Sequence, residues 1–201
     1  MNALTHPARV LALARHQGLL RSRDLAAQGI PRIVLARLTA GGQLEQVGRG
    51  LYQLPEADPI GDTGLVTAAV KSPNCVFCLL TALRLHGITT QSPRVVWIAL
   101  PQGSHTPRMA YPPIRMIQVS GACQSAGIET VYDGGVPLRV SGVARTVVDC
   151  FKHRSKVGLD VALEALKEAL SQKKVSPDEL WHFAKICRVT NVMRPYLEAL
   201  L

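Results

Sequence analysis

The chain has 201 residues, of which 47% are hydrophobic, and its 23 lysines and arginines against 14 aspartates and glutamates give a net charge of +9. This size suits one large domain or two small ones, with enough apolar material for a core. No run approaches the roughly 18 apolar residues of a transmembrane helix, and charged residues interrupt the first apolar stretch, where a secretory signal would lie. The five cysteines are odd in number and irregularly spaced, unlike a disulfide framework. We therefore expect a cytoplasmic protein with reduced thiols, no secretory signal and no membrane partner.

The positive charge is densest at the N-terminus. Residues 1–57 hold seven basic residues, all of them arginines, against three acidic ones, whereas the rest of the chain holds sixteen against eleven. Basic proteins of this size often bind phosphate groups, and arginine favours bidentate contacts with phosphates or guanine edges. Nucleic acid is therefore a candidate partner, although charge alone does not decide this.

Three short helices are predicted at the N-terminus. A proline at the first helical position and an apolar stripe predict the first over residues 7–17. Ser22 has the features of an N-cap for a second helix over 23–28. Another proline opens a third helix over 31–40, which ends at a pair of glycines.

The third helix has two unlike faces at 100° per residue. Its inward side consists of Val34, Leu35 and Leu38. Its outer side carries small or flat residues between two arginines, with no acid, and consists of Arg32, Ile33, Ala36, Arg37 and Ala40. Short side chains flanked by arginines are what a helix needs for close approach within a DNA groove.

A hairpin follows the third helix. Extended segments over 43–47 and 51–54 are joined by an arginine between two glycines, Arg49, although Val47 departs from the alternation set by Leu44. Three helices followed by a hairpin form the winged helix-turn-helix arrangement, in which the third helix enters the major groove and Arg49 reaches phosphates or the minor groove. The alternatives are a small helical bundle with a solvated hairpin and a winged helix that binds protein.

A linker rich in proline, glycine and acids over 55–64 separates this winged helix, residues 1–57, from a second domain, residues 58–201. The second domain is predicted to run from helices through strands and back to helices, which indicates an α+β domain with a C-terminal helical region. The expected helices cover 64–70, 74–86, 143–153 with Ser141 as its cap, 159–170, a segment begun by a capping box of Ser176 and Glu179, and a short last helix; the expected strands cover 94–100, 114–120, 128–134 and 136–142.

The histidines and cysteines do not form a recognisable metal or catalytic motif. Cys75 and Cys78 make a C-x-x-C inside an apolar run without a second ligand pair, so we expect core cysteines. The other cysteines, Cys123, Cys150 and Cys187, are expected to be inert single thiols. His86 is expected to bond carbonyls at the end of its own helix, and His105 with Arg108 lies on a proline-rich loop where a phosphate contact is the functional alternative.

The carboxylates do not form a nuclease cluster either. Glu164 and Lys167 have the wrong spacing for a metal-dependent nuclease, and Asp149 is expected to make a helix-surface ion pair with Arg145 four residues before it. Phosphate-binding and dinucleotide-binding glycine motifs and the nucleophile elbow are missing from the sequence. We therefore predict no catalytic, cofactor-binding or metal-binding residue and no enzyme.

Four segments, in matching order over nearly the whole chain, resemble the AbiEi-type antitoxins of the type IV AbiE toxin–antitoxin system. They are VGRGLYQLP (47–55), CLLTALRLHGIT (78–89), VWIAL (96–100) and ARTVVDCFKHRSKVGLDVALEAL (144–166). The resemblance implies a winged helix that represses its own operon by binding repeats in the promoter. It also implies a C-terminal domain that neutralises a nucleotidyltransferase-like toxin without forming a stable complex with it. Carried over by position, the DNA contacts fall on Arg32, Ile33, Ala36, Arg37 and Arg49.

Three functions remain in competition at this point. The first is a DNA-binding antitoxin that represses its own operon. The second is a stand-alone winged-helix transcription factor whose α+β domain senses a ligand or mediates association. The third, an enzyme that acts on nucleic acid, is disfavoured by the missing carboxylate cluster.

Overall fold

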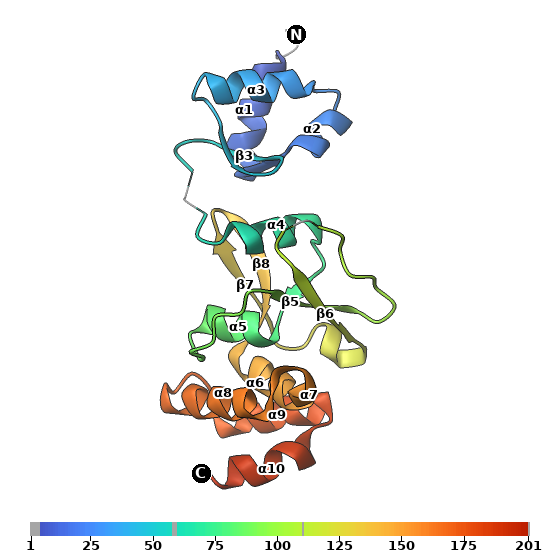
Figure 1. Ribbon diagram of the computed structural model, residues 1–201, viewed down its shortest axis with the longest axis vertical. Coiled ribbons are helices and arrows are strands. Elements are labelled where there is room, and N and C mark those ends of the chain that lie inside the picture. Colours follow the sequence, from blue (N-terminus) through green and yellow to red (C-terminus); the bar gives the residue numbers. More distant parts are fainter. Residues whose placement is uncertain (1–4, 58–59, 110, 201) are drawn as a thin grey trace. The chain divides into compact units, whose positions relative to one another are not determined.

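The computed structural model describes residues 5–57, 60–109 and 111–200 (Figure 1). Its residues divide into two compact units, the first formed by 1–71 with 132–137 and the second by 72–131 with 138–201. The predicted domain boundary at 57/58 adjoins Asp58 and Pro59, which lie outside the described residues, so that boundary stays a prediction.

The first unit contains the expected winged helix. Three helices pack over a small antiparallel sheet whose strand order is β1-β3-β2. The elements are α1 (His6–Gln17), β1 (Leu19–Arg21), α2 (Ser22–Ala27), α3 (Arg32–Ala40), β2 (Glu45–Gly48) and β3 (Leu51–Gln53). The strand β1 was not predicted, because three residues are too few to show an alternating pattern.

An apolar core holds the winged helix together. All three residues predicted to face inward from α3 are buried in it. The buried members of this core are Val10, Ala14, Leu20, Leu25, Ile30, Val34, Leu35, Leu38, Leu44 and Leu54. Because α3 is fixed through one stripe of side chains, its opposite side is left free for contact.

Two local details of the winged helix differ from prediction. Ser22 is the first residue of α2 rather than its N-cap, and Arg21, which occupies the cap position, makes no side-chain cap bond. Instead, the Arg21 Nε donates to Asp24 Oδ2 at 2.6 Å. The break in alternation at Val47 is a register shift in the β2–β3 pairing between Gln46 and Gly48, so the irregular sequence corresponds to an irregular strand.

The second unit is built around a five-stranded mixed sheet with the order β6-β5-β4-β8-β7. The strand β5 runs antiparallel to β4 and parallel to β6, and β4 runs parallel to β8. The strands are β4 (Val76–Phe77), β5 (Val96–Pro101), β6 (Ile114–Val119), β7 (Ile128–Asp133) and β8 (Val136–Ser141). The turn between β7 and β8 belongs to the first unit, with α4 (Thr63–Lys71).

Most helices of the second unit gather beyond one end of the sheet, as Figure 1 shows for α6 to α10. The helix α6 is the centre of this layer and contacts α5, α8, α9 and α10. The helices are α5 (Leu79–His86), the 3-10 turn η1 (Gly121–Gln124), α6 (Val143–Lys152), α7 (Arg154–Val157), α8 (Leu159–Ser171), α9 (Pro177–Cys187) and α10 (Thr190–Glu198). Helices, strands and a C-terminal helical region confirm the predicted α+β class.

Three predictions for the second unit can be checked in detail. The capping box is confirmed, because Ser176 Oγ accepts from the Glu179 N–H at 3.3 Å while Glu179 Oε2 accepts from the Ser176 N–H at 2.8 Å. The single helix predicted over 74–86 is wrong in its first part, where β4 joins the sheet before α5 begins. Ser141 does not cap α6, because Gly142 occupies the cap position without any side-chain bond.

Among the residues that the structure describes, every helix is too short or too polar to cross a lipid bilayer.

Candidate nucleic-acid interface

The outer face of α3 is exposed along its length. Arg32, Ile33, Ala36 and Arg37 all lie on this face, and Ile33 keeps 56% of its surface accessible. The face holds no acid. The sequence therefore placed the exposed residues of α3 correctly, while their contact with DNA stays a prediction.

The arginines of the winged helix differ in whether they have a partner. Arg21 and Arg23 both approach the Asp24 carboxylate, at 2.6 and 3.5 Å. Within the described part of the chain, no hydrogen bond or ion pair is formed by the exposed side chains of Arg32, Arg37 and Arg49. These three guanidinium groups retain their charge and all their donors for an external acceptor.

The wing arginine is held in place through its neighbour Gly50. Gly50 has a φ of +74°, and its carbonyl accepts from the Ser22 N–H at 2.9 Å. A Cβ at Gly50 would lie 2.9 Å from the Ser22 hydroxyl oxygen. Glycine is thus required by both conformation and space, and it fastens the wing to the start of α2 with Arg49 exposed at the tip.

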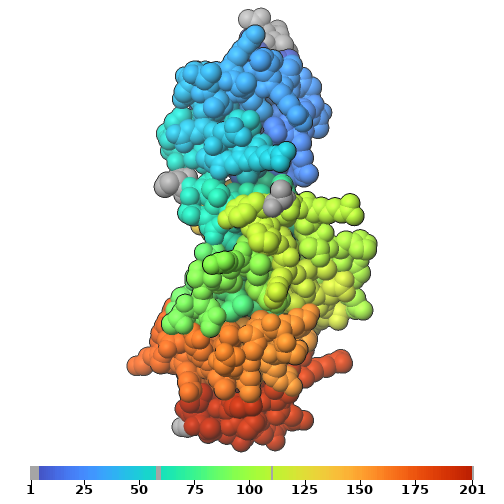
Figure 2. All heavy atoms as spheres, in the orientation of Figure 1, coloured from blue at the N-terminus to red at the C-terminus, as the bar shows by residue number. Residues whose placement is uncertain are grey.

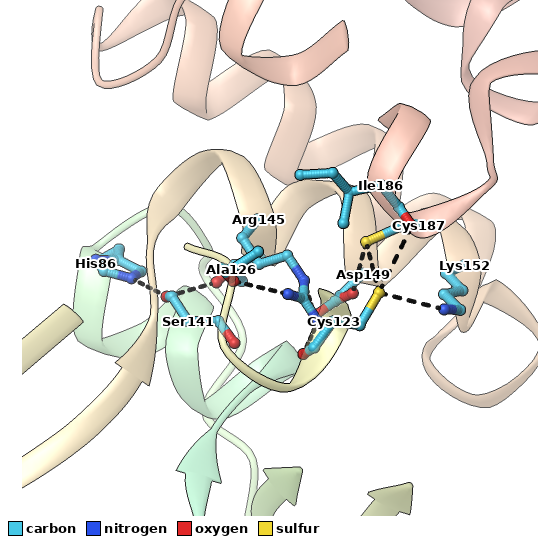
Figure 3. Close-up of polar contacts among 10 residues, drawn as sticks. His86, Cys123, Ala126, Ser141, Arg145, Asp149, Lys152, Ile186 and Cys187 are labelled. Atoms are coloured by element: carbon cyan, nitrogen blue, oxygen red, sulfur yellow. Dashed lines mark hydrogen bonds and ion pairs between the residues drawn. The ribbon is translucent and has the colours of Figure 1, made fainter. Parts of the chain in front are cut away.

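A second polar group lies inside the second unit, between η1 and the helices α6 and α9 (Figure 3). Arg145 donates from Nε to Asp149 Oδ2 at 2.9 Å, and its other nitrogens donate to the carbonyls of Ala126 and Cys123 at 2.8 and 3.1 Å. The Arg145 and Asp149 side chains are only 3% and 2% exposed. The predicted surface ion pair is therefore wrong in its location: α6 is covered on several sides by α5, α8 and α9, so its polar pair is enclosed too.

The charge state of this pair follows from its surroundings. Burial lowers the pKa of Arg145, but the Asp149 carboxylate and its hydrogen bond more than offset this effect, and the pKa is raised overall. The guanidinium thus stays charged and holds the carbonyls of Cys123 in η1 and of Ala126 after it to α6. This is a structural role rather than a catalytic one.

The cysteines are buried, as predicted for Cys75 and Cys78. Burial raises the pKa of Cys75 to about 11 and that of Cys187 to about 12, so these thiols stay protonated and unreactive near neutral pH. Cys123 and Cys187, expected to be isolated, place their sulfur atoms 3.6 Å apart. Nothing in the sequence brings these two residues together, because they are 64 positions apart.

His86 also has a different partner from the one expected. Its Nε2 lies 2.7 Å from the Ser141 carbonyl at the end of β8 (Figure 3). The Thr146 hydroxyl donates to the same oxygen at 2.8 Å. The histidine therefore fastens α5 to the end of a strand instead of satisfying its own helix. Among the described residues, no group of three or more histidine, cysteine or acidic side chains is arranged to hold a metal ion.

Comparisons with known proteins bear on the exposed face of α3. Residues 8–55, which include α3 and the wing, match the family described as transcriptional regulator, AbiEi antitoxin. Over this segment the chain is similar to that family. The resemblance expected from sequence is thereby confirmed for the winged helix.

A comparison of folds extends over the whole chain. The crystal structure of the Rv2827c protein from Mycobacterium tuberculosis superposes with a TM-score of 0.56, at 17% sequence identity, and the match covers 100% of this chain and 82% of that one. At this identity the likeness concerns the fold, a winged helix followed by an α+β domain. No curated protein matches the chain.

Proposed function

We propose that this protein is the antitoxin of a type IV toxin–antitoxin system and that it represses its own operon by binding repeats in the promoter. The observation that carries the proposal is the exposed, acid-free face of α3, whose Arg32 and Arg37 have no partner among the described residues, together with the exposed wing arginine. The AbiEi match over residues 8–55 supports the same reading.

In the proposed complex, α3 lies in the major groove and each side chain has a distinct task. Arg32 and Arg37 reach guanine edges or phosphates, Ala36 permits close approach, and Ile33 contacts the methyl group of thymine. Arg49 contacts the phosphate backbone or the minor groove. The first two arginines would determine sequence preference, whereas Arg49 would add affinity for any sequence.

Gel-shift titration with the chain's own promoter tests the recognition helix. Changing Arg32 or Arg37 to Ala removes a contact that costs about 1–3 kcal/mol when it reads a guanine edge. The matched control is Arg15→Ala, which removes one exposed arginine from α1, outside α3 and the wing. Promoter affinity equal to that of the control in both α3 variants would remove the recognition-helix assignment.

The antitoxin role requires a separate test, because DNA binding does not imply it. The proposed functional partner is a nucleotidyltransferase-like toxin encoded next to this gene, neutralised without a stable complex. Growth rescue on co-expression with the neighbouring gene supports this role. If promoter binding is observed but no rescue occurs, the alternative holds, namely a stand-alone winged-helix regulator whose α+β domain senses a ligand or mediates association.

A further inference from the structure

Two of the buried cysteines form a pair to which the proposed function gives no task. Cys123 lies in η1 and Cys187 is the last residue of α9, and their sulfur atoms are 3.6 Å apart (Figure 3). All five cysteines of the chain are free thiols. A disulfide joins two sulfur atoms at about 2.05 Å, so this pair needs a further approach of only about 1.5 Å.

The other three cysteines are placed less favourably for such a bond. Cys75 and Cys78 flank the extended strand β4, so their Cα atoms lie about 10 Å apart at about 3.3 Å per residue. That separation exceeds the roughly 7 Å that a disulfide can span. Cys150 is fully enclosed in α6, at 0% exposure, which keeps it from any dissolved oxidant.

The two sulfur atoms of the pair have neighbours of opposite charge. Lys152 Nζ lies 4.0 Å from Cys123 Sγ, so an ammonium group stands beside the sulfur where negative charge would develop during attack on an oxidant. Cys187 Sγ instead donates to Asp149 Oδ1 at 3.7 Å, so a carboxylate is in place to take up its proton (Figure 3). The surroundings therefore suit Cys123 as the first nucleophile and Cys187 as the second.

Cys123 is also the more accessible of the two thiols. It keeps 7% of its surface exposed, against 2% for Cys187. The other three residues of η1 are exposed, and 3-10 turns have poorer hydrogen-bond geometry than α-helices. The helices beside it are closely packed on the face shown in Figure 2, whose orange and red atoms belong to residues 143–200. We therefore expect η1 rather than α9 to move, which both admits a small oxidant and closes the gap.

We propose that Cys123 and Cys187 are a site of reversible oxidation, at which a peroxide converts the two thiols into a disulfide between η1 and α9. In the first step, the Cys123 sulfur attacks one oxygen of hydrogen peroxide. The S–O bond forms while the O–O bond breaks, and the departing hydroxide combines with the thiol proton to give water. The product is a sulfenic acid at Cys123.

The second step closes the disulfide. The Cys187 sulfur attacks the Cys123 sulfur, so that the S–S bond forms while the S–O bond breaks and hydroxide leaves. The Cys187 proton passes to Asp149 and from there to the hydroxide, which gives a second water. Each sulfur has then given up one electron, and the peroxide has been reduced by both.

The burial of Cys187 accounts for the order of the two steps. Burial raises the pKa of Cys187 to about 12, so this thiol does not attack the oxidant itself. It reacts only with a sulfenic acid held against it, where proximity compensates for weak nucleophilicity. Neither DNA nor a toxin takes part in these steps, so the inference stands apart from the proposed function.

A metal site is the competing interpretation of two adjacent cysteines. A structural zinc ion needs four ligands, but within the described residues no group of three histidine, cysteine or acidic side chains is arranged to hold an ion. The nearby Asp149 carboxylate already faces the Arg145 guanidinium, at 2.9 Å. Two thiols with one free approach between them suit a disulfide better.

The test oxidises the full chain with hydrogen peroxide after reduction and removal of the reductant. Free thiols are counted by alkylation in denaturant, and disulfides are located by peptide mass. The variants are Cys123→Ser and Cys187→Ser, with Cys75→Ser as the control because it removes an equally buried thiol outside the pair.

The unaltered chain and the Cys75 variant should each lose the two thiols of the pair and yield a peptide that joins Cys123 to Cys187. Neither of the other variants should form this bond. The Cys187 variant should stop at the sulfenic acid, which dimedone labels. Dithiothreitol should restore all thiols of the unaltered chain.

Two further measurements follow the chemistry and its effect. Lys152→Gln should slow the oxidation roughly fivefold, the ratio that one charge at about 4 Å gives at the dielectric constant of water, whereas Lys156→Gln, a nearby exposed control, should not. The disulfide links residues 64 positions apart, so the oxidised chain should unfold at a urea concentration about 1–2 M higher.

The unaltered chain decides the inference, whether or not the serine variants fold. The inference is overturned if the folded chain keeps both thiols after prolonged exposure to peroxide, or if the mapped disulfide joins other cysteines or two chains. Equal oxidation rates in the two lysine variants would overturn the first step as assigned. A reduced chain that neither binds the promoter nor rescues growth would count against the proposed function and leave this result unaffected.

Discussion

The buried pair of Arg145 and Asp149 allows a quantitative prediction for the stability of the second unit. In Asp149→Ala, the guanidinium stays enclosed, at 3% exposure, and keeps its bonds to the carbonyls of Ala126 and Cys123 but loses its counter-charge. The lost charge-assisted hydrogen bond is worth about 1.5–3 kcal/mol. With the cost of an unpaired buried charge, the free energy of unfolding should fall by about 3–5 kcal/mol.

The side-chain chemistry at position 149 sets an order among the variants. Asp149→Asn keeps an oxygen that accepts from Arg145 Nε, so its loss should be smaller, on the order of half that of the alanine variant. Glu198→Ala is the control, since it removes an exposed carboxylate from α10 and should change the free energy of unfolding by less than about 0.5 kcal/mol.

The assay can be confined to the second unit, because both tryptophans of the chain, Trp97 and Trp181, belong to it. Urea unfolding followed by tryptophan fluorescence therefore reports on the unit that contains the pair. With a urea dependence of about 2 kcal/mol per M, the alanine variant should shift the midpoint down by about 1.5–2.5 M. A loss below about 1 kcal/mol, or an asparagine variant no better than alanine, would refute the view that the pair is a buried, charged clamp.

Burial lowers the pKa of His153 below its ordinary 6.5; Lys156 and Lys152 add to this effect and Asp149 opposes it. As the pH falls, the unfolded chain takes up a proton first, so stability that is present above pH 7 is lost below 6.5. His153→Gln should therefore make the free energy of unfolding less dependent on pH between pH 7 and 5. Gly50→Ala should strain the positive-φ wing and press on the Ser22 hydroxyl, so gel shifts should show weaker binding to operator and random DNA alike while the tryptophan-detected unfolding stays unchanged. Gly127→Ala would place its Cβ 2.6 Å from the Phe183 ring at a φ of +63°, and calorimetry should show a destabilisation of about 2 kcal/mol or more; an unchanged unfolding temperature would contradict this packing.

Features set by local chemistry were predictable from the sequence. The two faces of α3 follow from a helical period over nine residues, the wing from its flanking glycines, and the box at Ser176 from a three-residue spacing. Each of these depends on neighbours within one or two turns of chain. The exposed residues of α3 and the wing were therefore placed correctly in advance, and their contact with DNA stays a prediction.

Features set by distant contacts were not predictable. The strands β1 and β4 have three and two residues, too few to show a period, and they exist because neighbouring strands pair with them. The position of Asp149 four residues after an arginine is typical of an exposed helix pair, and only the layer of helices around α6 encloses it. The approach of Cys123 to Cys187 likewise depends on how η1 packs on α9.

The shortness of β4 has a consequence for how the five-stranded sheet responds to load. Among the described strands, the two-residue strand β4 lies between β5 and β8, and Phe77 lies opposite Ile98 on one side and Val140 on the other. Bending the sheet along this line strains few main-chain bonds, whereas bending it between β5 and β6 strains a ladder of six residue pairs. We therefore expect the sheet to bend most easily along β4, where the fully buried Phe77 ring packs.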